Sequence, residues 1–181
     1  MSHPPTLAGG VSLTLTTTLL MPLPSPALLS LDAALALTGL SKRTLWRRIA
    51  EGGLRKQEAE GSKQATALVL DDVLLLAGLM LDAENYALLQ LADAGDATAQ
   101  TEIGQSLLQR QRYAAAVYWL TRAAEQGAAD AMQCLGHCHA TGQGLPRDGH
   151  LALMWIAKAA AAGHPIARRQ IAGLCPPSRH D

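Results

Sequence analysis

Cysteine is scarce in this chain, and no stretch of it is long and apolar enough to cross a membrane. There are three cysteines, Cys134, Cys138 and Cys175, and this odd, sparse set is consistent with reduced thiols rather than a disulfide framework. A membrane-spanning helix needs about 18 or more apolar residues in a row, and no window of the sequence reaches that length. We therefore expect a cytoplasmic protein that does not enter the membrane.

Charge is missing from the beginning of the chain. The first thirty residues contain no Asp, Glu, Lys or Arg, so the apolar segment Val11–Leu23 lacks the preceding cationic region of a signal peptide. We expect residues 1–28 to form a poorly ordered leader. Met21, which precedes a proline-rich stretch, is an alternative start of the protein.

The 181 residues have no net formal charge, but the charges are unevenly distributed. Between Lys42 and Lys63 there are seven Lys or Arg and three acids, whereas Gln64 to Gln109 contains seven acids and no Lys or Arg. A chain of this length has room for one ordinary domain or two small ones. A basic module joined to an acidic one predicts a polyanion partner for the first module only.

A turn followed by a short basic helix is the most informative local pattern. Ser41 is suited to cap this helix, because its hydroxyl can accept a hydrogen bond from a free backbone N–H. Leu45 and Ile49 lie four residues apart and form one apolar face. Arg43 and Arg47 lie on the opposite side. An apolar inner face with a basic outer face is what a recognition helix in the DNA major groove needs.

The flanking segments extend this pattern to a winged helix-turn-helix. Residues 31–37 predict a first helix, and residues 55–60 and 64–70 predict a hairpin, the wing. Two carboxylates, Asp71 and Asp72, precede an expected helix over 73–81, where the helix dipole favours negative charge.

At these residues the chain resembles the AlpA-type prophage regulators and excisionases of the MerR-like superfamily. Their pattern, L-T-G-L-S-x-x-T-[LIV]-[YW]-R-x-I-x-x-G, is matched almost position for position by Leu37–Gly52. The wing departs from the family, since Glu58 and Glu60 place negative charge where such wings are usually basic. The resemblance implies double-stranded DNA as a partner.

The DNA contacts expected from the basic helix and the wing fall into two groups. Base edges are expected to face Arg43, Thr44 and Arg47. Phosphates are expected to contact Lys42, Arg48, Arg55, Lys56 and Lys63. The alternative for these charges is a solvated helix face without a ligand.

The second half of the chain repeats itself. A glycine precedes an alanine by four residues at three places, Gly95/Ala99, Gly127/Ala131 and Gly163/Ala167. The first helices recur after 32 residues, and the second helices after 36, because Gly142–Leu145 is an insertion. Such units predict an α-solenoid of antiparallel helix pairs, in which Gly and Ala allow close crossings and Trp119 and Trp155 fill the space between units.

The second full unit, residues 131–163, resembles a Sel1-like repeat. That pattern is A-x-x-x-L-G-x-x-Y-x-x-G-x-G-V-x-x-D-x-x-x-A-x-x-W-x-x-K-A-A-x-x-G. The matching residues are Leu135, Gly136, Gly142, Gly144, Asp148, Ala152, Trp155, Lys158, Ala159, Ala160 and Gly163. His139 replaces the tyrosine and Leu145 the valine. The resemblance implies a scaffold for protein–protein contacts with no chemistry of its own.

One cluster invites a chemical interpretation. Cys134, His137, Cys138 and His139 lie on one expected helix, where positions three and four apart share a face and could ligate a metal. No second ligand pair lies nearby, and no third group orients a Cys–His pair for nucleophilic attack. We favour small thiols packed at a helix crossing, and expect no metal, cofactor or enzymatic activity.

The sequence thus predicts a mainly α protein. After the leader, residues 29–81 form a small winged helix-turn-helix with a short β-hairpin, residues 82–174 an α/α Sel1-like (TPR-related) solenoid, and residues 175–181 a tail. The predicted function is a nucleoid-associated transcriptional regulator that binds DNA, with repeats that mediate protein–protein interaction or self-association. The alternative is an adaptor that does not bind DNA and uses both modules as docking surfaces.

Overall fold

The computed structural model describes residues 26–58 and 66–174. The leader up to residue 25, the tip of the wing with Glu60 and Lys63, and the tail with Cys175 lie outside the described residues. In the part of the chain that is described, no helix has the length and hydrophobicity to span a bilayer.

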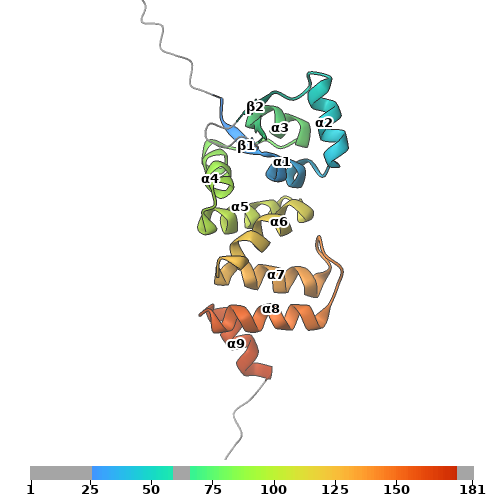
Figure 1. The fold of residues 1–181 in the computed structure, drawn as a ribbon. Coiled ribbons are helices and arrows are strands. Elements are labelled where there is room, and N and C mark those ends of the chain that lie inside the picture. The colour runs from blue at the N-terminus through green and yellow to red at the C-terminus, as the bar shows by residue number, and fades with distance from the viewer. Residues whose placement is uncertain (1–25, 59–65, 175–181) are drawn as a thin grey trace, which may run out of the picture.

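The N-terminal part combines short helices with a three-stranded antiparallel sheet of order β1-β3-β2 (Figure 1). Its elements are β1 (Leu28–Ser30), α1 (Leu31–Thr38), α2 (Lys42–Ala50), β2 (Lys56–Glu58), β3 (Thr66–Val69) and α3 (Leu70–Ala77). Serine side chains cap both early helices as expected, since Ser30 accepts from the amide of Ala33 and Ser41 from that of Thr44. Gly39 ends α1 in the left-handed conformation, with φ 66°, which allows the sharp turn into α2.

Two sequence predictions in this part are wrong in their boundaries. Strand β1, in which Leu29 pairs with Leu68 of β3, is not expected from the sequence, and it includes Leu28, a residue of the expected leader. The third helix runs over Leu70–Ala77 rather than 73–81. It stops early because Gly78 adopts a left-handed conformation, with φ 63°, and its N–H bonds back to the carbonyls of the last turn.

The remaining helices form a chain of antiparallel pairs that runs away from the sheet (Figure 1). They are α4 (Ala83–Ala94), α5 (Ala97–Gln109), α6 (Tyr113–Glu125), α7 (Ala129–Thr141), α8 (Gly149–Ala161) and α9 (Pro165–Leu174). Within each complete pair a glycine lies at the crossing. A Cβ at Gly104 would lie 2.7 Å from the side chain of Leu120, and one at Gly136 2.7 Å from that of Ile156. These two glycines therefore set the close approach of α5 to α6 and of α7 to α8.

The buried core crosses the junction between the two parts. One hydrophobic cluster extends from Leu29 in β1 to Leu135 in α7, with Trp119 fully buried inside it. Polar contacts reinforce the junction, because Asp93 of α4 accepts hydrogen bonds from the amide and hydroxyl of Ser30. Arg112 also donates to the carbonyl oxygen of Ala77, 2.5 Å away. The N-terminal part and the repeats as far as α7 therefore share one hydrophobic core.

Candidate functional site

Helix α2 is held to the core by one face and presents the other to solvent. Leu45 is fully buried, and Ile49 is half-buried on the same side. Trp46 is 38% exposed at the edge of this face, so it does not complete the core. The hydroxyl of Ser41 accepts a hydrogen bond from the amide of Thr44 at 3.2 Å and fixes the start of the helix. The sequence prediction of this helix and its cap is confirmed.

The outer face of α2 carries the basic side chains expected there. Lys42, Arg43, Arg47 and Arg48 are all exposed. Among the described residues the only ion pair of this group is a long one, 3.8 Å, from Arg47 to Glu51. A cavity of about 320 Å³ is lined by Arg43, Thr44 and Arg47. The two arginines of this lining carry guanidinium donors suited to a phosphate or to the acceptors of a guanine edge.

The predicted phosphate ligands of the wing are placed differently from one another. Arg55 is held by Asp72 of α3 through two side-chain bonds, Nε to Oδ2 at 2.9 Å and Nη2 to Oδ1 at 2.8 Å. The backbone N–H of Arg55 also donates to Asp72. Lys56 is exposed in β2, and Lys63 lies outside the described residues. Arg55 therefore fastens the base of the wing to α3, and its guanidinium is already engaged.

The bond from Arg55 holds the pKa of the Asp72 carboxyl below its usual value, and it raises the pKa of Arg55. A carboxyl with a lowered pKa in the folded state stabilises the fold above its ordinary pKa, and this stabilisation is lost as pH falls through the lowered value. We expect Asp72→Asn to lower the Tm at pH 7 and to have little effect near pH 2. Thermal melts followed by circular dichroism at both pH values test this.

The matched control is Glu102→Gln, which neutralises an exposed carboxyl in α5 that makes no ion pair with the described residues. It should leave the Tm nearly unchanged at both pH values. If Asp72→Asn lowered the Tm by as much near pH 2 as at pH 7, the ion pair with Arg55 would not be the cause of the decrease.

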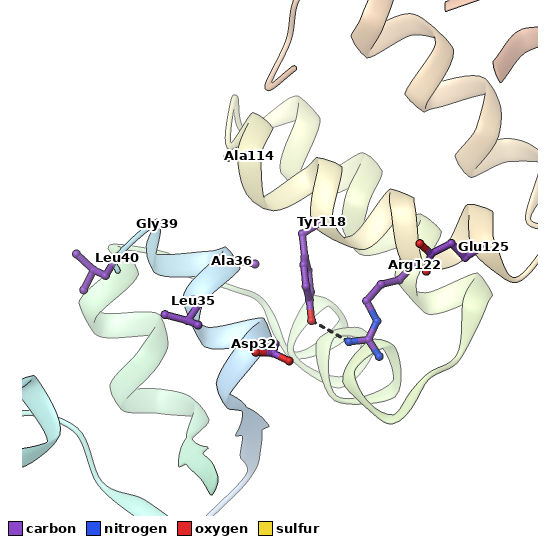
Figure 2. A pocket seen from close by; sticks show the side chains of 9 residues that line it. All are labelled: Asp32, Leu35, Ala36, Gly39, Leu40, Ala114, Tyr118, Arg122 and Glu125. Carbon is purple, nitrogen blue, oxygen red and sulfur yellow. Dashed lines mark hydrogen bonds between the residues drawn. The ribbon is translucent and has the colours of Figure 1, made fainter. Parts of the chain in front are cut away.

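An open cavity of about 740 Å³ lies between α1 and α6, where the N-terminal part meets the repeats (Figure 2). In it Arg122 donates a hydrogen bond to the hydroxyl of Tyr118 at 2.8 Å and also stacks near the Tyr118 ring. Burial raises the pKa of the Tyr118 phenol, so it stays protonated at neutral pH. The two carboxylates of the lining, Asp32 and Glu125, flank this pair. The cavity has no nucleophile–base pair and no phosphate cradle.

The cysteine–histidine cluster of α7 is divided between the core and the surface. Cys138 and His139 are buried, whereas His137 is exposed. Burial raises the pKa of Cys138 to about 11, so the thiol is protonated at neutral pH. No group of three or more His, Cys, Asp or Glu in residues 26–58 and 66–174 is placed to hold a metal ion.

The surface of the last helices is unusually apolar. The described residues include nine exposed large hydrophobic side chains, and five of them lie on α8 and α9. These five are Leu151, Leu153, Met154, Ile166 and Leu174. No Asp or Glu occurs between Gly149 and Leu174, where Lys158, Arg168 and Arg169 supply positive charge. This surface could not be predicted from the sequence, because the same residues fit the helical pattern of a buried repeat.

Two solved structures are similar to parts of the chain. A Sel1 repeat protein from Oxalobacter formigenes is 32% identical over 56% of this chain and 31% of its own, with a TM-score of 0.46. The antigen c5321 from uropathogenic Escherichia coli, described as displaying an SLR fold, is 23% identical over 78% of this chain and 32% of its own, with a TM-score of 0.48. The chain thus spans about a third of the length of either protein. No curated protein matches it.

The family model of the Sel1 repeat matches residues 99–127 and residues 129–164. These segments cover α5–α6 and α7–α8, the two complete helix pairs. Both matches lie outside residues 37–52, so the resemblance of that segment to AlpA-type regulators stays a prediction. The chain is therefore a mainly helical protein with two segments that match the Sel1 repeat.

Proposed function

We propose that this chain is a non-catalytic interaction protein whose Sel1 repeats bind another polypeptide. Sel1 repeats serve protein–protein interaction, and the observation that carries the proposal is the apolar surface of α8 and α9. Leu153 is 45% exposed and Met154 38% exposed on one turn of α8. Several exposed apolar side chains on neighbouring helices favour an interaction surface. The absence of acids from Gly149 to Leu174 favours a partner surface with negative charge.

A paired substitution on α8 tests this proposal. The double variant Leu153→Ser/Met154→Ser should retain its fold, because neither side chain belongs to the hydrophobic core cluster, and should lose partner binding by about tenfold or more. Quantitative capture of partner protein by the immobilised full chain measures the loss. The control Leu75→Ser removes a leucine that is 84% exposed on α3 and should bind as the parent does. Equal capture by all three proteins would overturn the assignment of the surface.

A second function, binding of double-stranded DNA, is favoured by the outer face of α2. There Lys42, Arg43 and Arg48 form no ion pair with any of the described residues. We propose that α2 enters the major groove and that Lys56 contacts phosphate from the wing. One such small module buries little surface, so useful specificity requires a dimer or a partner, which the repeats would supply. With both functions the chain is a nucleoid-associated regulator of transcription.

The salt dependence of binding separates this regulator from an adaptor that does not bind DNA. Filter binding with a random-sequence duplex at two salt concentrations should give weaker binding at the higher one, because phosphate contacts release counterions. An adaptor would give no binding above background at either concentration. That outcome would leave the repeats as the functional part of the chain.

A further inference from the structure

The open cavity between α1 and α6 is a groove between one face of each helix (Figure 2). On both helices the lining residues keep the spacing of a single helix face. Those of α6 are Ala114, Tyr118, Arg122 and Glu125, and those of α1 and the turn after it are Asp32, Leu35, Ala36, Gly39 and Leu40. Across the groove from Asp32 lie Tyr118 and Arg122, so charged side chains gather at one end (Figure 2).

Two hydrogen-bond donors at the charged end are free to bind an acceptor. Arg122 donates from Nη1 to the Tyr118 oxygen and makes no ion pair with the described residues. The Tyr118 oxygen accepts this bond, so its own O–H can donate to a ligand, and no described residue takes that proton. The guanidinium carbon lies 5.6 Å from the ring centroid of Tyr118 and 5.9 Å from that of Trp119. A hydroxyl and a guanidinium side by side are donors that a carboxylate accepts.

The opposite wall supplies an acceptor. Asp32 lies exposed in the first turn of α1, and its carboxylate forms no ion pair with the described residues. Asp32 and Arg122 therefore line one cavity with opposite charges that do not pair with each other. Such an arrangement is complementary to a ligand that carries both charges, with its anion toward Arg122 and its cation toward Asp32.

A ligand with charge of only one sign fits this end of the cavity less well. Glu125, which is also exposed and forms no ion pair with the described residues, adds a second carboxylate to the lining. An anion without a cationic group would be repelled by Asp32 and Glu125. A cation without an anionic group would be repelled by Arg122 and would leave its donors unused.

The rest of the cavity is suited to an apolar group. Its lining there carries no polar side chain and consists of Leu35, Ala36, Gly39, Leu40 and Ala114. The cavity volume of about 740 Å³ falls within the usual range for small-molecule sites, roughly 300–1,000 Å³. A zwitterionic head group at the charged end therefore leaves room for an apolar side chain along the remainder of the groove.

We propose that this cavity binds a free α-amino acid with an apolar side chain. Its carboxylate accepts hydrogen bonds from Arg122 and Tyr118, and its ammonium group pairs with Asp32. An α-amino acid carries both charges on one carbon atom, so it matches two opposite charges at one end of a cavity. The carboxyl-terminal residue of a polypeptide shares the carboxylate and the side chain but lacks the ammonium group. The cavity shares no residue with the apolar surface of α8 and α9 or with the outer face of α2.

Isothermal titration calorimetry of the full chain with L-leucine, L-isoleucine, L-valine, L-methionine and L-phenylalanine, one at a time, tests the proposal. At least one of them should bind with a Kd below about 1 mM. Arg122→Gln, Tyr118→Phe and Asp32→Asn should each weaken that binding by about tenfold or more, because each removes a hydrogen bond to a charged group. The controls Arg147→Gln and Glu102→Gln remove the same charges from exposed residues outside the cavity and should bind like the parent.

Ligand analogues assign each contact. The N-acetyl form of the amino acid that binds lacks the ammonium group, so it should bind more weakly and should lose no further affinity in Asp32→Asn. The corresponding amine lacks the carboxylate, so it should lose no further affinity in Arg122→Gln. Asp32 is exposed and lies outside the hydrophobic core cluster, so Asp32→Asn tests the site even if Arg122→Gln does not fold.

Two results would overturn the proposal outright. One is the absence of binding by all five amino acids, and the other is equal binding by the parent and the three cavity variants. Tighter binding of the N-acetyl form than of the free amino acid would also overturn it, and would assign the cavity to the carboxyl-terminal residue of a polypeptide.

Discussion

Replacing Trp119 with alanine should lower the free energy of unfolding by about 3–5 kcal/mol, the usual cost of emptying a large buried aromatic site. Trp119 is fully buried, and its ring packs edge-on against Tyr118 with the centroids 4.9 Å apart. Its indole nitrogen has no hydrogen-bond partner among the described residues, so the loss is one of packing. Urea denaturation followed by circular dichroism measures the effect.

The destabilisation should spread beyond the repeats. The cluster around Trp119 includes Leu29 of β1 and Leu135 of α7, so the cavity weakens a core that both parts share. Hydrogen exchange on the Trp119→Ala protein should show faster exchange in α1 and α3 as well as in α5–α7. Protection that was lost only in the repeats would show that the boundary near residue 81 separates independent folding units.

Trp155→Ala is the matched control. Trp155 occupies the equivalent place in the next unit but is only half-buried, with the ammonium of Lys158 4.5 Å from its ring centroid. Its substitution should cost clearly less than that of Trp119. Equal costs would mean that burial in this fold does not explain the stability of the two sites.

Local features of the fold could be predicted from the sequence. The helix caps at Ser30 and Ser41 involve residues three apart, so the sequence alone contains both partners. The repeat register was predictable for the same reason, because Gly104 and Gly136 recur with a fixed spacing and fit the crossings. The basic face of α2 could be predicted because it depends only on the spacing of residues that share one face of a helix.

Features that depend on distant residues could not be predicted in this way. Strand β1 is three residues long and exists because β3, far along the chain, pairs with it. The bond between Arg55 and Asp72 turns an expected phosphate ligand into a structural contact, and nothing in the local sequence of either residue signals it. Trp119 and Trp155 have the same motif but different burial, because the elements packed around each unit decide its exposure.

The candidate DNA interface leads to the second large effect. Arg43→Ala/Arg47→Ala should weaken specific DNA binding by about 2–6 kcal/mol, at 1–3 kcal/mol for each good base contact. Both side chains are exposed and line the cavity on the outer face of α2, so the substitutions remove donors without opening the core. The free energy of unfolding should therefore change by less than about 0.5 kcal/mol for each site.

A control variant that loses the same number of positive charges elsewhere distinguishes direct contact between α2 and DNA from long-range electrostatic attraction. Arg147→Ala/Lys158→Ala removes two exposed positive charges from the repeats and should leave specific binding nearly intact. Titration of a duplex selected for binding to the parent, at constant salt, measures both double variants. Parent-like affinity in Arg43→Ala/Arg47→Ala would rule out α2 as the recognition helix. Equal weakening in both would mean that net charge, not the outer face of α2, governs binding. Because specific contacts act only within hydrogen-bond distance, a loss confined to the α2 variant would assign the duplex to this face.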